Sequence, residues 1–161
     1  MNNRTCFIMR SYPGAGKSFK SKEIASTNEN TVIVSADDYW MIDGKYVFDV
    51  NRLGEAHAQC YRLFTEAVAN GQNVIVDNTN LNYKDMIKYI NHLVLHNDYS
   101  DVKYSIELVN VQYNDIDTAI KLRSNREDGK NIPENVMRRM WKQFKEDIRG
   151  RLLADYNGKI G

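Results

Sequence analysis

The sequence predicts an α/β fold in which helices cover a mostly parallel sheet of about four or five strands. Short apolar runs typical of buried strands alternate with longer stretches whose apolar residues recur every three or four positions. This alternation indicates β-α-β units, which place consecutive strands parallel. The strand candidates are Cys6–Met9, Thr31–Val34, Asn73–Val76 and Tyr104–Val111.

Helical patterns occupy the intervals between these runs. The first helix is expected to begin at Lys17 and to reach about Thr27. Asn51, and Asn114 or Asp115, are suitable starts of later helices, because short polar side chains accept hydrogen bonds from the first free amides of a helix.

The last part of the chain predicts one further helix and a tail. Pro133 suits the first turn of a helix, where its missing amide is not needed. Residues 150–161 are expected to form a loose tail. Apolar residues recur at four-residue steps between these two points, as one continuous helix requires: Val136, Met140, Phe144 and Ile148.

Length and composition favour a single domain, which we expect to span residues 1–161. No apolar stretch approaches the length of a membrane span, and no N-terminal segment resembles a signal peptide, so we expect a cytoplasmic protein without membrane contact. Cys6 and Cys60 lie in apolar contexts and are expected to be reduced core residues. The sequence carries no signal for or against a homo-oligomer.

Charge is unevenly distributed, although the whole chain carries a formal net charge of only +1. The segment from Lys121 to Arg151 holds ten basic and five acidic side chains. Such a segment favours contact with the phosphates of a nucleotide or a nucleic acid, or it forms an ordinary solvated helix face.

A glycine-containing segment, residues 11–18, directly follows the first strand candidate. Gly14 and Gly16 allow the backbone to approach a phosphate closely, and the amides at a helix N-terminus attract anions. Lys17 would reach the β- and γ-phosphates, and the hydroxyl of Ser18 would ligate Mg²⁺. Ser11 stands where the full pattern has glycine. The segment predicts a phosphate-binding loop and, with the alternating elements, a P-loop NTPase-type three-layer sandwich.

Polar side chains follow the next two strand candidates. Asp37 and Asp38 come after the second run, and Asp77 and Asn80 follow the third. Ligands of parallel sheets bind beyond the carboxyl ends of the strands, so these residues are expected in one crevice with the loop.

Each acid suggests its own chemistry. Asp37 comes first after its strand and is the candidate general base for a hydroxyl that attacks the γ-phosphate. Asp38 would hold a turn or a helix end. Asp77 resembles the carboxylate that contacts Mg²⁺ directly or through water, with acceptor positioning as its competing role. Strand-end acids also serve as simple helix caps.

Arg123 and Arg126 lie near the end of a helical stretch, before a segment that contains glycine. Arginines in this position suggest a lid that closes over the triphosphate and stabilises its transition state. The alternative is that the helix dipole favours cations at this end.

Together, these motifs resemble the polynucleotide 5′-hydroxyl kinase family of P-loop phosphotransferases, which includes the phage polynucleotide kinase and the kinase module of NEDD4-binding protein 2. The resemblance covers roughly residues 5 to 150. It is carried by Pro13–Ser18, Asp37–Tyr39, Asp77–Asn82 and the Arg123, Arg126 and Pro133 positions.

The resemblance implies ATP with Mg²⁺ as donor and a 5′-hydroxyl of DNA or RNA as acceptor. It implies catalytic roles for Lys17, for Asp37 as general base and for Arg126 as lid arginine. The implied ATP contacts are Gly14, Ala15, Gly16, Lys17, Ser18, Phe19, Arg123 and Arg126. The implied acceptor contacts are Asp38, Trp40, Asp77 and Asn80, and the implied magnesium ligands are Ser18 and Asp77.

Trp40 departs from the phage enzyme, which has an arginine there that grips an acceptor phosphate. The tryptophan could stack on a base or belong to the core. Two other functions stay open: a kinase for another hydroxyl, such as that of a nucleoside, a small metabolite or a hydroxymethylated DNA base, and an ATPase or nucleotide-binding switch. A compact kinase of this kind suits a phage genome, and hence a host cytoplasm.

Overall fold

The computed structural model describes residues 3–124 and 131–161. Its central sheet has four strands in the order β2 (Thr31–Val34), β5 (Asn73–Val76), β1 (Asn3–Arg10) and β6 (Lys103–Asn110). Every neighbouring pair in this sheet is parallel. The predicted α/β class and the parallel sheet are therefore confirmed.

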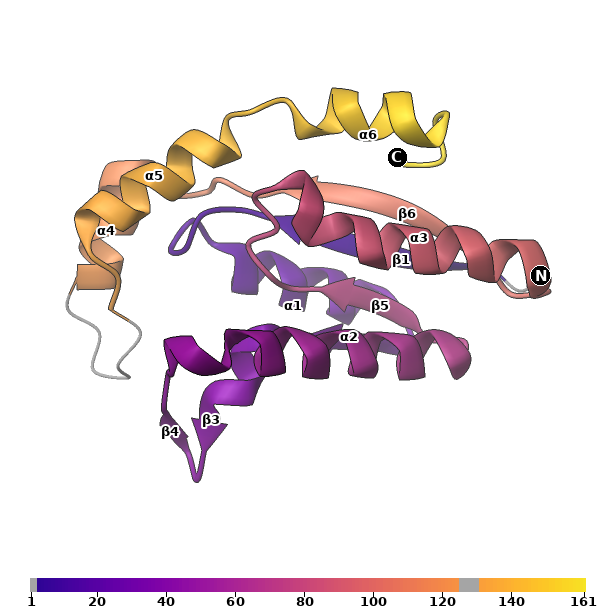
Figure 1. Ribbon diagram of the computed structural model, residues 1–161, viewed down its shortest axis with the longest axis horizontal. Helices are drawn as coiled ribbons and strands as arrows, with labels where there is room; N and C mark the ends of the chain where they lie inside the picture. The colour runs from indigo at the N-terminus through magenta and orange to yellow at the C-terminus, as the bar shows by residue number, and fades with distance from the viewer. Residues whose placement is uncertain (1–2, 125–130) are drawn as a thin grey trace.

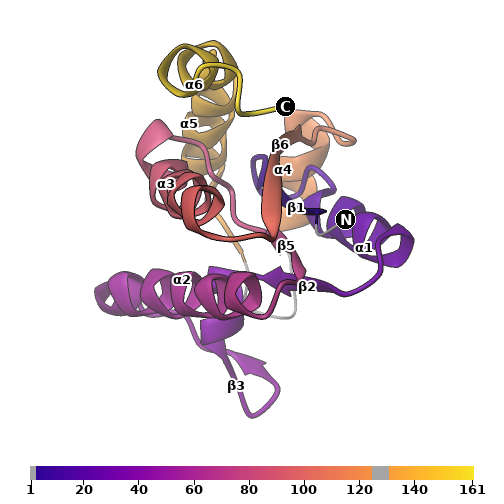
Figure 2. The same cartoon turned by 90° about the vertical axis from the view of Figure 1, so that its right-hand side faces the viewer.

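Helices cover both faces of the sheet (Figures 1 and 2). α1 (Lys17–Thr27) lies on one face, and α2 (Leu53–Ala69) and α3 (Tyr83–Tyr99) lie on the other. Side chains of a strand alternate between faces. In β1, accordingly, Cys6 and Ile8 join the core under α2 and α3, whereas Phe7 and Met9 join the core under α1.

The chain reverses its direction across the sheet after β2. It moves outward from β1 to β2 through α1, and then returns through α2 to β5 and through α3 to β6. Crossovers between parallel strands are right-handed, so the outward and the return crossovers lie on opposite faces. The reversal brings the carboxyl ends of β1 and β5 side by side, where ligands of such sheets bind.

Two groups of elements surround this carboxyl edge. After β2 the chain forms the 3₁₀ turns η1 (Ala36–Trp40) and η2 (Val50–Arg52), with a hairpin of β3 (Met41–Ile42) and β4 (Lys45–Tyr46) between them. After β6 it forms α4 (Ile116–Ser124), α5 (Glu134–Phe144) and α6 (Ile148–Tyr156). In Figure 1 the hairpin projects from one end of the molecule, below α4 and α5.

The predicted continuous C-terminal helix is wrong, because it divides into α5 and α6. The buried guanidinium of Arg10 donates hydrogen bonds to the carbonyl oxygens of Phe144 and Gln143, at 2.7 and 2.9 Å. A continuing helix would need these two carbonyls for its own amides four residues later. The side chain of Asp147 then caps the new helix at the amide of Gly150.

The predicted loose tail is also wrong. Residues 148–156 form α6, whose Leu152 is fully buried in the main core. Beyond it, Ile160 pairs in parallel with Ile106 of β6, and the amide of Gly161 donates to the Ile106 oxygen at 2.7 Å. The polar local sequence gave no sign of these contacts, which depend on a distant strand. None of the described helices has the length and apolar character that crossing a bilayer requires.

Leu152→Ala is expected to lower the free energy of unfolding by about 2–5 kcal/mol, because it removes a fully buried side chain and leaves a cavity. Urea denaturation followed by circular dichroism measures the effect. Leu95→Ala, at an exposed leucine of α3, is the control and should change the value by less than about 0.5 kcal/mol. Equal values for the two variants would contradict the docking of α6.

Candidate active site

The glycine-containing loop between β1 and α1 has the backbone shape of an anion cradle. Gly14 and Gly16 have positive φ angles of 82° and 105°. Gly16 is also the N-cap of α1, and no side chain caps the helix there. A Cβ atom on Gly16 would lie 2.8 Å from the ring of Tyr113, so a larger residue would not fit. The first amides of α1 are left facing the loop, where they attract an anion.

Ser11 stands where this loop usually begins with glycine, and its side chain and amide both form hydrogen bonds that fix the loop. The residue is fully buried, and its hydroxyl donates to the backbone oxygen of Val111 at 2.7 Å. Its amide donates to the oxygen of Thr79 at 3.0 Å. The first position of the loop is thereby tied to the segments that follow β6 and β5.

Asn114, predicted only as a helix start, fixes the loop from the other side. Its amide side chain donates to the Gly14 oxygen at 2.8 Å, and its backbone amide donates to the Ala15 oxygen at 3.1 Å. The hydroxyl of Tyr12 donates to the Asn114 oxygen at 2.6 Å. Burial, with a smaller contribution from Asp115, raises the pKa of Tyr12 and keeps this donor protonated. Nothing in the local sequence signalled the role of Asn114.

Lys17 and Asp77 meet at the carboxyl edge of the sheet. The Nζ atom of Lys17 lies 2.5 Å from Oδ1 of Asp77, and their side chains are only 16% and 11% exposed. The pair forms because α1 begins directly beside the end of β5. The first residue of α1, directly after the glycine loop, is thereby paired with the carboxylate that ends β5.

Asp37 lies in the first turn of η1, which follows β2, the neighbour of β5 in the sheet. Ser35 caps that turn by accepting a hydrogen bond from the Asp37 amide at 3.2 Å. The amide of Ala36 donates to the side-chain oxygen of Asn78 at 2.9 Å, and the amide of Asp77 donates to the Val34 oxygen at 2.8 Å. The ends of β2 and β5 are thus hydrogen-bonded to each other.

The side chains of Asp37 and Asp38 are exposed at this joined edge. The hydroxyl of Tyr46, on the hairpin, donates to Oδ1 of Asp37 at 3.4 Å. Asn78, which follows the strand-end aspartate directly, was not singled out from the sequence, although its position offered the signal. The loop, the η1 turn and Asp77 each follow a strand of the same parallel sheet, and their use in one site stays a prediction.

Two predicted acceptor contacts are wrong. Trp40 is only 3% exposed and packs in the main core, edge-on to Tyr39 and Phe48, so its ring offers no face to a base. Asn80 is 2% exposed, and its amide donates to the backbone oxygen of Met9 at 2.7 Å. It has a positive φ of 47° and shapes the turn after β5.

The other predicted nucleotide contacts are distributed around the loop. Phe19 is 66% exposed on α1 and packs edge-on against Tyr113, with ring centroids 6.0 Å apart. Arg123 is half-buried near the end of α4, and its backbone oxygen accepts a hydrogen bond from the Ile132 amide at 3.1 Å. Arg126 lies outside the described residues.

The residues predicted to hold Mg²⁺ offer suitable donors. Ser18 presents an exposed hydroxyl at the start of α1, and Asp77, the partner of the neighbouring Lys17, presents a carboxylate. Magnesium prefers hard oxygen ligands, and it usually keeps several waters and binds substrate phosphates rather than filling an all-protein cage. Within the described residues, no three acidic, histidine or cysteine side chains form such a cage. The donor set therefore fits a metal that arrives with a nucleotide.

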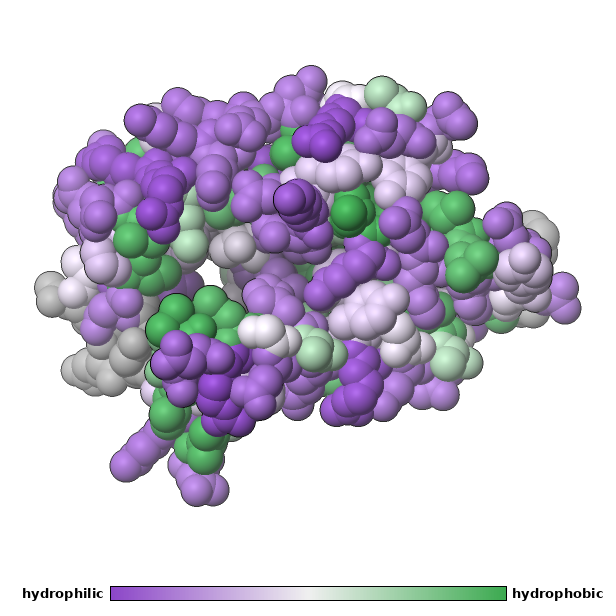
Figure 3. Space-filling model, in the orientation of Figure 1, coloured by the Kyte–Doolittle hydropathy of each residue, from purple (hydrophilic) through white to green (hydrophobic). Residues whose placement is uncertain are grey.

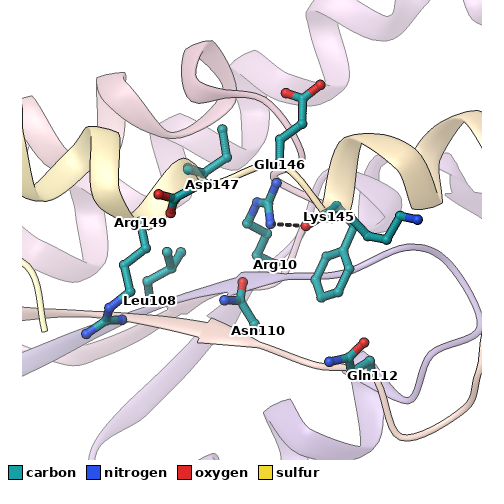
Figure 4. A pocket seen from close by; sticks show the side chains of 10 residues that line it. Arg10, Leu108, Asn110, Gln112, Lys145, Glu146, Asp147 and Arg149 are labelled. Atoms are coloured by element: carbon teal, nitrogen blue, oxygen red, sulfur yellow. Dashed lines mark hydrogen bonds between the residues drawn. The ribbon is translucent and has the colours of Figure 1, made fainter.

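A separate cavity of about 520 Å³ lies at the junction of α5 and α6 (Figure 4). Its lining residues include Arg10, Asn110, Lys145 and Arg149. The hydrogen bond from Arg10 to the backbone oxygen of Phe144, at the end of α5, forms part of the cavity wall. None of the predicted site residues lines it. The cavity therefore lies where β1 contacts α5 and α6, outside the predicted site.

The fold and this edge define a P-loop domain of the kinase type. Residues 7–147 match the family described as an AAA domain (AAA_33), and the chain therefore belongs to that family. Over 84 residues, which are 52% of the chain, it is 42% identical to NEDD4-binding protein 2 of Homo sapiens. The resemblance predicted from the motifs is confirmed by this similarity. The matched segment is 5% of that relative's length.

Solved structures show the same fold. A chain of the Pnkp1/Rnl/Hen1 RNA repair complex superposes with a TM-score of 0.64 at 20% identity, over 88% of this chain and 44% of that one. A gluconokinase from Sinorhizobium meliloti 1021 superposes with a TM-score of 0.52 at 14% identity, over 92% of this chain and 78% of that one. The present chain thus spans less than half of the repair-complex chain.

Proposed function

We propose that this protein transfers the γ-phosphate of ATP to a 5′-hydroxyl of DNA or RNA, with Asp37 as general base. One observation carries the proposal. The exposed carboxylate of Asp37 follows Ala36, whose amide is hydrogen-bonded to Asn78, and Asn78 directly follows Asp77, the partner of Lys17. A phosphate cradle and an acceptor base are thereby held on a single edge.

Each residue has a part in this reaction. The amides at the start of α1 and the Lys17 ammonium hold the β- and γ-phosphates and neutralise their charge. Ser18 and Asp77 would hold Mg²⁺, whose positive charge would offset the negative charge that develops on the phosphates during transfer. Asp37 orients the attacking hydroxyl and accepts its proton. Arg123 and Arg126 are the proposed lid arginines, and Phe19 and Asp38 are proposed contacts of ATP and of the acceptor.

One structural neighbour and the charge of the chain support a nucleic-acid acceptor. The fold is shared with a chain of an RNA repair complex. The basic stretch from Lys121 to Arg151 offers charge for a phosphate backbone.

A kinase for a less charged hydroxyl is the second candidate. The acceptor side, from Asp37 to Glu55, holds five acidic and only two basic side chains. Of the two, Arg52 is engaged by Glu55 and by the hydroxyl of Tyr39. This charge favours a nucleoside or a small metabolite over a polyanion, and the transfer assay below separates these acceptors.

Asp37→Asn is expected to lower the rate of transfer by about 10²- to 10⁴-fold, because the amide cannot accept the proton of the hydroxyl. ATP affinity should stay within about twofold, since the cradle is intact. The measurement is transfer of labelled γ-phosphate from ATP to a single-stranded oligonucleotide with a 5′-hydroxyl, with nucleosides as parallel acceptors.

Asp98→Asn, at the far end of α3, is the matched control and should transfer at the wild-type rate. Equal losses of transfer and of ATP binding in Asp37→Asn would remove the residue from the role of base. Hydrolysis of ATP without label on any hydroxyl would leave an ATPase or switch as the function.

A further inference from the structure

Exposed apolar side chains gather next to Asp37, on the hairpin and the residues that follow it. Among the described residues, eleven large hydrophobic side chains are exposed, and six of them lie in this short segment. We call these six the hairpin patch: Met41, Ile42, Val47, Phe48, Val50 and Leu53. Figure 3 shows hydrophobic surface on the projecting hairpin and at the start of α2, within an otherwise mostly hydrophilic face. A patch of this kind indicates a binding surface.

The hairpin that carries the patch has a regular two-residue turn and contacts the core. Its turn has positive φ angles at both central residues, 50° at Asp43 and 77° at Gly44, which matches the twist of a two-residue hairpin. The Val47 amide donates to the Trp40 oxygen at 2.7 Å. The ring of Phe48, 52% exposed, rests on the buried ring of Trp40 with centroids 5.1 Å apart. The core thus presents Phe48 to solvent as a fixed platform.

The same hairpin contacts Asp37, the proposed general base. Met41 pairs directly with Tyr46 across the two strands, so the two side chains share one face. The Tyr46 hydroxyl donates to Asp37 at 3.4 Å. Met41 and Phe48 are therefore the patch residues whose placement is tied to the acceptor carboxylate and to the core beneath it.

Charge decides which part of an acceptor fits here. The segment from Asp37 to Glu55 has an excess of three negative charges, and Lys45 is its only basic residue besides the engaged Arg52. Phosphates bind where lysine and arginine gather, and an acidic surface repels them. An uncharged, flat and apolar group is the complement of this surface. In a nucleic acid that group is an unpaired base.

We propose that the base of the acceptor's 5′-terminal nucleotide packs on Phe48 and Met41 while its 5′-hydroxyl faces Asp37. This inference rests on the proposed function and adds the substrate class: a single-stranded 5′ end that is recognised by its base. The phosphate backbone leads away from the acidic hairpin. Recognition by stacking accepts any of the four bases, since each presents a π face.

The test compares two oligonucleotides with 5′-hydroxyls, one intact and one that lacks only the terminal base. Phe48→Ala should weaken binding of the intact oligonucleotide about 5- to 150-fold, and it should not change binding of the abasic one. The slope of log affinity against log salt should equal that of the wild type, because no phosphate contact is lost. Binding is measured by fluorescence anisotropy with a 3′ label, and phosphate transfer is measured in parallel.

Two further variants test whether the effect of Phe48→Ala comes from misfolding or from the loss of any exposed aromatic ring. Phe48→Leu keeps apolar volume over Trp40 and should recover the fold while losing most of the discrimination between the two oligonucleotides. Tyr99→Ala removes an aromatic ring that is 85% exposed at the end of α3 and should bind both as the wild type does.

The outcomes separate this inference from the proposed function. Equal losses on both oligonucleotides, or none on either, would overturn base recognition even if transfer proceeds. Discrimination by binding without any transfer would keep the patch as a base platform and discard the kinase activity. Wild-type protein that neither binds nor labels the oligonucleotides would overturn both.

Discussion

Lys17→Met should reduce phosphate transfer by about 10³-fold or more, the largest effect on activity that we expect from a single substitution. In the present structure Lys17 is the cation paired with Asp77, at 2.5 Å in a mostly buried position. Methionine keeps much of the length and removes the charge. The triphosphate would then meet the Asp77 carboxylate without its counterion, so a neutralising contact is lost and a repulsive one is exposed. Steady-state transfer kinetics at several ATP concentrations measure the loss.

Lys22→Met is the matched control, because Lys22 is an exposed lysine of the same helix. It should change transfer by less than about twofold, and both variants should unfold at similar urea concentrations if Lys17 acts on the nucleotide. Transfer in Lys17→Met within tenfold of the wild type would contradict the assignment of the loop as the phosphate cradle.

Arg10→Met should lower the free energy of unfolding by about 3–5 kcal/mol, the largest effect on stability that we expect. Arg10 is 2% exposed and donates to three carbonyl oxygens, those of Phe144, Leu81 and Gln143, at 2.7 to 2.9 Å. Burial lowers the pKa of its guanidinium, and the carboxylates of Glu146 and Asp85 oppose that shift. Removal of the guanidinium leaves buried carbonyls without donors, each of which carries a desolvation penalty.

Arg4→Met is the control for this second prediction. Arg4 lies at the other end of β1, is half-buried, and also donates to backbone oxygens, those of Gly71 and Asn3. Water can replace it there, so a loss below about 1 kcal/mol is expected. Urea denaturation gives both values. If Arg10→Met also lowers the free energy of unfolding by less than about 1 kcal/mol, the placement of α5 and α6 does not depend on the hydrogen bonds of Arg10.

The strands and the loop were predictable because their signals are local. The second and third strands have the predicted bounds, and α1 begins and ends where its pattern predicted. Apolar runs of four residues, glycines before a lysine, and an acid at the end of a strand are each contained in one short segment. Their backbone shapes depend little on the rest of the chain.

Trp40 and Asn80 show where local reasoning failed. Both stand in motifs that point to a site, yet both side chains turn inward, Trp40 under the hairpin and Asn80 to the oxygen of Met9. Asn78 and Asn114, neither of which was predicted to be a site residue, hold the site together by hydrogen bonds to residues 42 and 100 positions away. A polar residue beside a motif does not reveal whether it binds a ligand or the protein's own backbone.

The sequence by itself determined the α/β class, the phosphate-binding loop, and the acids that end two strands. The tertiary structure decided the strand order, the meeting of Lys17 with Asp77, the division of the last helix by Arg10, and the pairing of Ile160 with β6. The physical reason is range. Backbone preference and burial periodicity act over a few neighbouring residues, whereas these contacts join residues 54 to 134 positions apart, and only the packed chain brings them within hydrogen-bonding distance.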